Sequence, residues 1–267
     1  MHDIIIIGSG PAGLSAAIAA RSRGKSVVIV SNNASGSGLY KAPAVDNYPG
    51  LPGISGAELS RKLLSHAVDM GAEIITGRVT SALKLNDSIS VAYGNDMISG
   101  KALILTTGVV QTSVFPGEAE LLGRGVSYCA TCDGMLYRGR NVVVVSLSPE
   151  AAAEAEFLRS IGCGVTELTT KNVVINGTDK LESITADGSE IPCDAVFVLR
   201  PSISPSALLP GLEITNGHIV VSHGYKTTID GVFAAGDCIG RPYQIAKAVG
   251  EGQMAAFSAI EYADEFS

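Results

Sequence analysis

Two stretches of the chain share one pattern of apolar and polar positions. Residues 4–31 and 142–169 align without a gap at an offset of 138 residues, with Pro11 opposite Pro149. Each stretch runs from four consecutive aliphatic residues through a short turn into an alanine-rich segment, and then into a second apolar strand. This order of strand, turn, helix and strand is the βαβ unit of parallel sheets. The repeat therefore predicts two Rossmann-like units in one chain.

The turn of the first repeat carries the glycine fingerprint of a dinucleotide site. Gly8, Gly10 and Gly13 form G-x-G-x-x-G between the predicted strand and the predicted helix. The first glycine permits a tight turn, the second admits a pyrophosphate to the backbone, and the third packs the helix on the strand. Free N–H groups at the helix N-terminus then favour the phosphates. Because Ser31 and Asn32 replace the acid expected after the second strand, ribose recognition must differ from the usual pattern.

The turn of the second repeat lacks these glycines. Ser146, Ser148 and Ala151 occupy the three places, and side chains at the first two hold the backbone away from a phosphate. Glu150 and Glu154 put negative charge into the predicted first turns of the helix, where it repels a pyrophosphate. We therefore expect the second unit to keep the scaffold of a dinucleotide site without its binding loop.

A pair of cysteines lies between the two repeats. Cys129 and Cys132 form C-x-x-C, the spacing of thiols that exchange with a disulfide, and Asp133 follows at once as a candidate proton carrier. Two alternatives are a zinc site and a pair of inert buried cysteines. Zinc needs four ligands, and the remaining cysteines and the four histidines offer no suitable cluster. A redox dithiol is favoured, with packing roles for the other cysteines: Cys163, Cys193 and Cys238.

Composition narrows the class of protein. The chain has 267 residues, 46% of them hydrophobic and 17% charged, which indicates a globular protein of about two domains. A net charge of −7 argues against general nucleic-acid binding, which needs a basic face. No apolar run reaches the roughly 20 residues that cross a bilayer, and the N-terminus lacks the features of a signal peptide. We expect a cytoplasmic protein that binds neither nucleic acid nor membrane.

Three motifs together resemble the low-molecular-weight thioredoxin reductases. They are GSGPAG near the N-terminus, CATCDG in the middle and GVFAAGDC at residues 231–238. The resemblance implies an α/β fold of two Rossmann-like, three-layer ββα domains. The FAD-binding domain would be discontinuous, comprising residues 1–113 and 230–267. A trimmed, NADPH-like central domain that carries the C-x-x-C pair would span residues 114–229, with hinges near 113–117 and 228–231.

The resemblance also assigns roles to individual residues. Cys132 would lie next to the flavin and take its electrons, Cys129 would attack the substrate disulfide, and Asp133 would be the acid-base residue. The substrate would be thioredoxin and the enzyme a homodimer. The residues that would bind FAD come from the glycine fingerprint, the DNYPG and LTTG segments, the AAGD motif and the segment after it: Gly8, Gly10, Pro11, Ala12, Gly13, Asn47, Thr107, Gly108, Gly236, Asp237, Tyr243, Gln244 and Ile245.

Departures from the family pattern bear on the electron donor. NADPH-using members keep the second glycine motif and an arginine-rich stretch after the next strand, and this chain has neither. The pattern is similar to the flavin-type, ferredoxin-dependent branch, as are LYKAPAVDNYPG and QIAKAVGEG. Because ferredoxins are acidic, their docking face should be locally basic. The candidates for that face are Lys41, Arg61, Lys62 and Arg241.

Four other functions stay open at this stage. The donor could be NADPH or a deazaflavin bound in an unusual way. The enzyme could instead be a dithiol oxidase that passes electrons to oxygen, or a diflavin disulfide oxidoreductase with a second FAD in the central domain. A flavin-bound redox sensor is the non-enzymatic alternative, although the acid beside the cysteines favours an enzyme.

Overall fold

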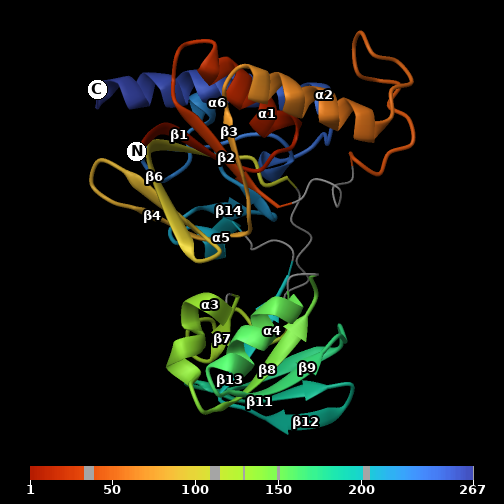
Figure 1. Cartoon of the computed structure of the whole chain (residues 1–267), viewed down its shortest axis with the longest axis vertical. Coiled ribbons are helices and arrows are strands. Elements are labelled where there is room, and N and C mark those ends of the chain that lie inside the picture. The colour runs from red at the N-terminus through yellow and green to blue at the C-terminus, as the bar shows by residue number, and fades with distance from the viewer. Residues whose placement is uncertain (33–38, 109–114, 129, 149–150, 201–204, 267) are drawn as a thin grey trace. The chain divides into compact units, whose positions relative to one another are not determined.

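The computed structural model describes residues 1–32, 39–108, 115–128, 130–148, 151–200 and 205–266. The chain divides into two compact units: residues 1–110 with 204–267 form unit 1, and residues 111–203 form unit 2. The predicted architecture, a discontinuous first domain with a second inserted into it, is confirmed. Both units are coloured along the chain in Figure 1.

The second boundary differs from the one expected at residues 229–230. Residues 204–229 belong to unit 1, because α5 (Pro205–Leu208) contacts β4 (Val79–Lys84) and β15 (His218–Ile219) contacts η4 (Asp237–Ile239). Leu208, Leu209 and Leu212 are also buried. The predicted hinge at 228–231 is therefore wrong: this turn leads into β16 (Val232–Ala234), and Gly231 packs against the ring of Tyr262. The second crossing between the units falls at residues 203–204.

Unit 1 is built on one seven-stranded sheet in the order β3-β2-β1-β6-β5-β4, with β16 also paired to β6. Strands β1, β2, β3, β6 and β16 are parallel, whereas β4, β5 and the first half of β6 form an antiparallel meander. Consecutive Ile and Val residues in β1 and β2 suit a sheet buried on both faces. The strands are β1 (His2–Ile7), β2 (Val27–Ser31), β3 (Glu73–Thr76), β4 (Val79–Lys84), β5 (Ile89–Tyr93), β6 (Asp96–Leu105), β14 (Ile214–Thr215), β15 (His218–Ile219) and β16 (Val232–Ala234).

Helices α1, α2 and α6 cover one face of this sheet (Figure 1). Small residues let α6 lie directly on α1: a Cβ atom at Gly252 would meet the carbonyl oxygen of Ala12 at 2.0 Å. The C-terminal helix thereby completes the layer begun by the N-terminal βαβ unit. The helices are α1 (Pro11–Arg21), α2 (Gly56–Asp69), α5 (Pro205–Leu208), η3 (His223–Tyr225), η4 (Asp237–Ile239) and α6 (Ile245–Glu265).

Unit 2 is smaller and has three layers. A parallel sheet in the order β7-β13-β8-β9 is covered on one face by α4 and on the other by the antiparallel meander β10-β11-β12. Its elements are β7 (Val126–Ser127), α3 (Ala130–Asp133), η2 (Gly134–Tyr137), β8 (Asn141–Ser146), α4 (Ala151–Ser160), β9 (Gly164–Leu168), β10 (Val173–Gly177), β11 (Leu181–Ala186), β12 (Ser189–Pro192) and β13 (Ala195–Leu199). The second predicted βαβ unit is thus β8, α4 and β9.

Candidate functional site

The glycines of the first repeat shape the N-terminus of α1. Gly8 has a φ of +111°, and a Cβ atom there would lie 2.4 Å from the carbonyl oxygen of Thr106. At Gly13 a Cβ atom would meet the carbonyl oxygen of Gly8 at 2.0 Å, so this position needs glycine for packing. Gly10 differs, because a Cβ atom there meets nothing within 4 Å. It is the N-cap of α1, no side chain caps the helix, and the first turn holds no acid. The first N–H groups of α1 are thus available to an anion.

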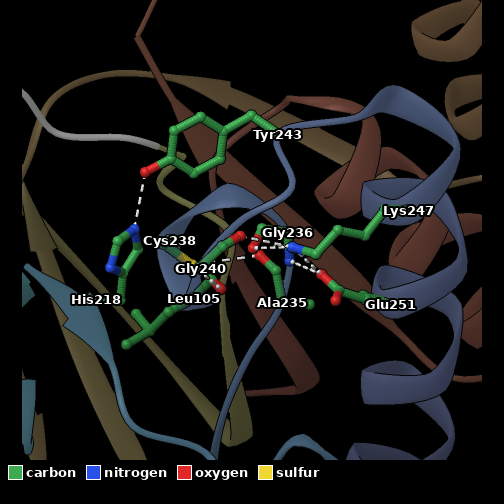
Figure 2. A network of polar contacts seen from close by, with 9 residues as sticks. All are labelled: Leu105, His218, Ala235, Gly236, Cys238, Gly240, Tyr243, Lys247 and Glu251. Carbon is green, nitrogen blue, oxygen red and sulfur yellow. Dashed lines mark hydrogen bonds and ion pairs between the residues drawn. The ribbon is translucent and has the colours of Figure 1, made fainter. Parts of the chain in front are cut away.

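The AAGD motif is held against this turn by two residues of α6. Figure 2 shows Lys247 and Glu251 reaching the loop at Gly236 and Gly240. The Gly236 N–H donates to Glu251 at 3.0 Å, and the Lys247 ammonium donates to the Gly240 carbonyl at 2.8 Å. Lys247 and Glu251 also pair with each other at 3.1 Å. Gly236 itself has a φ of +85°, and a Cβ atom there would lie 2.9 Å from that of Ala12. The sequence analysis missed Lys247 and Glu251.

A cavity of about 580 Å³ opens beside these two turns. Nine predicted cofactor residues line it: Gly10, Pro11, Ala12, Asn47, Gly108, Asp237, Tyr243, Gln244 and Ile245. The other four, Gly8, Gly13, Thr107 and Gly236, lie outside the lining, and Thr106 rather than Thr107 faces the cavity. Seven lining residues were not predicted: Leu39, Ala42, Ala44, Val45, Asp46, Thr106 and Ala248. They are mostly small or apolar, and they lie in segments that the sequence analysis singled out without naming them as site residues: LYKAPAVDNYPG, LTTG and QIAKAVGEG.

Polar contacts fix the side chains on one wall of the cavity. Asn47 donates to the side-chain oxygen of Gln244 at 2.7 Å, which joins two segments far apart in the sequence. The hydroxyl of Tyr243 lies 2.8 Å from Nε2 of His218 (Figure 2). The guanidinium carbon of Arg241 lies 4.9 Å from the centre of the Tyr243 ring. Tyr243 is thereby held from two sides.

Asp237 presents a carboxylate oxygen that needs a donor. Its Oδ1 atom is buried and has no hydrogen-bond partner in the structure. Burial raises the pKa of Asp237, as does the nearby Glu251, whereas Lys247 lowers it. An unsatisfied buried acceptor is costly. A ligand with a hydroxyl group could donate a hydrogen bond to Asp237 Oδ1, and its phosphates could accept hydrogen bonds from the first N–H groups of α1.

The predicted catalytic segment lies in unit 2. Asp133 ends α3, and Ser127 of β7 donates a hydrogen bond to its carboxylate at 2.7 Å. Cys132 belongs to α3, whereas Cys129 lies outside the described residues. The Ala130 N–H, at the start of α3, donates to the carboxylate of Glu154 at 2.8 Å.

Tyr128, the residue before Cys129, is tied to a buried ion pair. Burial raises the pKa of Tyr128, and the hydrogen-bonded carboxylate of Glu118 raises it further. Glu118 is 1% exposed and binds Arg200, which is 7% exposed, with one contact of 2.7 Å. The residues on both sides of Cys129 in the chain are therefore anchored by carboxylates, Glu118 and Glu154.

Helix α4, the counterpart of α1 in the second repeat, packs against the predicted catalytic segment. A Cβ atom at Gly134 would lie 2.9 Å from Leu158 and 3.1 Å from Phe157. The predicted role of Glu154, to repel a pyrophosphate, needs correction: its carboxylate is engaged by the Ala130 N–H. Glu150, predicted to act likewise, lies outside the described residues.

The remaining cysteines are confirmed as buried packing residues: Cys163, Cys193 and Cys238. Burial raises the pKa of Cys193 to about 12 and that of Cys238 to about 11. Within the described ranges, no cluster of three His, Cys, Asp or Glu side chains could hold a metal ion. In the same part of the chain, no helix has both the length and the apolar character needed to cross a bilayer.

Comparisons with known proteins agree with this geometry. A model of the pyridine nucleotide-disulphide oxidoreductase family matches residues 2–172 and 164–252. The thioredoxin reductase of Treponema pallidum (strain Nichols) is 32% identical over 299 residues, covering 98% of this chain and 97% of that protein. Since this chain has only 267 residues, that relative carries residues that this chain lacks.

Two solved structures are similar over almost their full length. A ferredoxin-flavin thioredoxin reductase from Clostridium acetobutylicum has a TM-score of 0.89 and 40% identity, with 97% of each chain covered. A thioredoxin reductase from Gloeobacter violaceus has a TM-score of 0.77 and 30% identity, with 99% of this chain and 95% of that chain covered.

Proposed function

The chain belongs to the pyridine nucleotide-disulphide oxidoreductase family and is a homologue of thioredoxin reductases, and on this premise we propose that it reduces thioredoxin with electrons from ferredoxin. FAD would be the cofactor and the pair Cys129 and Cys132 the redox-active dithiol. The protein would act in the cytoplasm as a homodimer.

The cavity of unit 1 fits FAD. The uncapped N-terminus of α1, with open space at Gly10, suits the pyrophosphate. The orphaned Oδ1 atom of Asp237 suits a ribityl hydroxyl, and Tyr243, Gln244 and Ile245 form a wall for the ring system. Bound there, FAD would accept electrons singly and pass them on in pairs to a disulfide.

The dithiol would carry out exchange with thioredoxin. The thiolate of Cys129 attacks one sulfur of the thioredoxin disulfide, and the other sulfur leaves as a thiolate. Asp133, held by Ser127 at 2.7 Å, gives that thiolate its proton. Cys132 then loses its thiol proton and attacks Cys129 in the mixed disulfide, and the second thioredoxin sulfur leaves and takes up a proton, so that reduced thioredoxin and a Cys129–Cys132 disulfide result. Two electrons and two protons, one from Asp133 and one from the Cys132 thiol, have passed to thioredoxin.

The choice of donor rests on the turn between β8 and α4. Serines replace the glycines that a pyrophosphate needs, and Glu154 from the first turn of α4 is bound to α3. The 40% identity to a ferredoxin-flavin thioredoxin reductase supports the same choice. For docking, Arg241 is the best placed of the four basic candidates, because it is exposed and stacks on Tyr243 at the cavity wall. Lys41, Arg61 and Lys62 are also exposed.

Anaerobic flavin bleaching tests the donor. The purified yellow protein is mixed in separate cuvettes with reduced ferredoxin, NADPH and NADH, and absorbance near 450 nm is followed. We expect rapid bleaching by ferredoxin alone, followed by thioredoxin reduction. Rapid bleaching by NADPH would contradict the proposal, because a turn without glycines would then serve a dinucleotide. No bleaching by any donor, with peroxide formed from small dithiols in air, would indicate a dithiol oxidase.

A further inference from the structure

An ion pair on α6 binds three backbone groups of the AAGD turn (Figure 2). Lys247 and Glu251 are four residues apart on the helix, and their charged groups lie 3.1 Å from each other. Glu251 accepts a hydrogen bond from the Gly236 N–H at 3.0 Å. Lys247 donates to the carbonyl oxygen of Gly236 at 3.4 Å and to that of Gly240 at 2.8 Å. The turn from Gly236 to Gly240 is therefore held at both of its ends by one helix.

The turn needs this anchor because glycines determine its course. Gly236 has a φ of +85° and Gly240 a φ of +133°, conformations that glycine adopts readily but that leave the unbound backbone free to move elsewhere. Both side chains of the ion pair are mostly buried, with 19% of Lys247 and 15% of Glu251 exposed. Water and salt screen such a pair weakly, and its charge-assisted hydrogen bonds are stronger than neutral ones. The pair is thus able to restrain the glycines.

Asp237 lies between the two anchored glycines. Its Oδ1 atom is buried without a hydrogen-bond partner in the structure, and the residue lines the cavity of unit 1. Because Asp237 follows Gly236 directly, the direction of its side chain depends on the backbone that the ion pair holds. Lys247 and Glu251 are not among the described residues that line the cavity. They therefore affect a ligand there through the turn.

Helix α6 also determines where α1 begins. A Cβ atom at Gly252, the residue after Glu251, would meet the carbonyl oxygen of Ala12 at 2.0 Å. Ala12 in turn packs on Gly236, whose added Cβ atom would lie 2.9 Å from that of Ala12. The start of α1, which suits phosphates, and the carboxylate of Asp237, which suits a hydroxyl group, are thus held at a fixed spacing by one helix.

We propose that the Lys247–Glu251 pair is a positioning device for the cofactor, which holds the Asp237 carboxylate where it accepts a hydrogen bond from a hydroxyl group of the flavin's ribityl chain. Without the pair, the turn would have to be ordered each time the cofactor binds, and this cost lowers affinity. The inference rests on the proposed function, in which FAD occupies this cavity.

Retention of FAD by the holoprotein tests this role. Each protein is diluted to nanomolar concentration, and the Kd for FAD is obtained from the fluorescence of the released flavin. We expect Glu251→Ala and Lys247→Met each to raise this Kd about tenfold, as for the loss of a hydrogen bond to a charged group. Asp237→Ala, which removes the acceptor, should raise it by at least as much. The control is Glu261→Ala, an exposed acid on the same helix, which should leave the Kd unchanged.

A double-mutant cycle shows whether the pair acts through Asp237. If it does, the addition of Glu251→Ala to Asp237→Ala causes no further loss of FAD, because the group that the pair positions is already absent. A pair that only supports the fold would give losses that multiply, to about a hundredfold, and this result would overturn the inference.

A milder variant serves if Glu251→Ala loses its native circular dichroism. Glu251→Gln keeps an acceptor for the Gly236 N–H and leaves Lys247 without its charged partner. We expect it to raise the Kd for FAD about threefold, and to add nothing in the Asp237→Ala background. If this variant also fails to fold, Lys247→Met takes its place in the cycle with the same expectation.

The outcomes separate the two proposals. If the wild type holds FAD and the variants at Lys247 and Glu251 hold it equally tightly, the inference fails and the proposed function stands. The same conclusion follows if Asp237→Ala binds FAD with the wild-type Kd. If the wild type binds no FAD, the proposed function fails together with the inference.

Discussion

Ser127 donates a hydrogen bond of 2.7 Å to the carboxylate of Asp133, from the end of β7 to the end of α3. Ser127 is 3% exposed, so its hydroxyl has a fixed place in the fold. The contact fixes the Oδ2 atom of Asp133 against β7. This geometry suits a residue that passes protons to a leaving thiolate.

Removal of the acid should slow thioredoxin reduction far more than removal of its anchor. We expect Asp133→Asn to lower kcat about 100-fold or more, as for the loss of a general acid, and Ser127→Ala to lower it severalfold because the carboxylate is no longer oriented. Steady-state reduction of thioredoxin measures both. Ser160→Ala, an exposed serine on α4, is the control. An unchanged rate in Asp133→Asn would remove the acid-base role.

Gly10→Val should separate cofactor binding from folding. The backbone at Gly10 is extended, with φ of −75°, and open space surrounds the position of its Cβ, so valine fits the protein but enters the cavity. We expect the thermal unfolding temperature of the flavin-free protein to change little and the flavin content, from the ratio of absorbance at 450 and 280 nm, to fall more than tenfold. Gly250→Val, also at an open position, should keep its flavin. A yellow Gly10→Val protein would contradict the cofactor site.

Native thiol reactivity should be confined to two of the five cysteines. Because burial raises the pKa of Cys193 to about 12 and that of Cys238 to about 11, both stay protonated at pH 8, and Cys163 is buried. We expect iodoacetamide to modify Cys129 and Cys132 rapidly in the reduced native protein, and all five cysteines after unfolding. The folded protein holds the Cys193 and Cys238 thiols protonated at a pH at which the unfolded chain would lose these protons. Their raised pKa values therefore contribute to stability below the ordinary thiol pKa near 9, and this contribution is lost as the pH rises toward 11–12. Mass spectrometry of the alkylated peptides counts the rapidly modified cysteines, and a third rapidly modified cysteine in the native protein would contradict this prediction.

Thioredoxin should dock on the exposed apolar pair that follows the catalytic segment. Met135 is 55% and Leu136 77% exposed in η2, directly after Asp133. An exposed apolar pair beside a reactive dithiol suits a protein substrate. We expect Leu136→Gln to raise the KM for thioredoxin about tenfold, in line with loss of a contact residue, without a change in flavin bleaching by the donor. Leu85→Gln, at an exposed leucine of unit 1, should leave KM unchanged. An unaltered KM in Leu136→Gln would place docking elsewhere.

The sequence predicted the parts of the fold that depend on local pattern. Both βαβ units, including the β8-α4-β9 repeat, follow from apolar runs and turn residues, and the glycine fingerprint located the start of α1. The boundary at 203–204 was missed because α5 and the β14–β15 hairpin are short, and their assignment to unit 1 depends on contacts with β4 and η4 and on burial of Leu208 and Leu212.

The candidate site was predicted where a motif marks it and missed where contacts across the fold create it. Lys247 and Glu251 lie in QIAKAVGEG, which the sequence analysis singled out, but nothing local in that segment shows that they hold the AAGD loop. Glu154 was interpreted as a repulsive charge because its partner, the Ala130 amide, lies 24 residues away in the chain. The one available signal was the replacement of Ala16 in the first repeat by an acid in the second.

Breaking the buried ion pair between Glu118 and Arg200 should destabilise unit 2. Both side chains are almost fully buried, and removing one partner leaves an uncompensated charge that costs about 3–5 kcal/mol. We therefore expect Glu118→Gln to lower the urea midpoint and to increase hydrogen exchange in residues 115–128, where Glu118 also accepts from the Phe115 N–H. The double variant Glu118→Leu, Arg200→Met should recover most of this loss, because apolar residues of similar size need no partner. If both proteins unfold at the wild-type midpoint, the pair does not anchor the segment that leads to Tyr128 and the proposed redox cysteines.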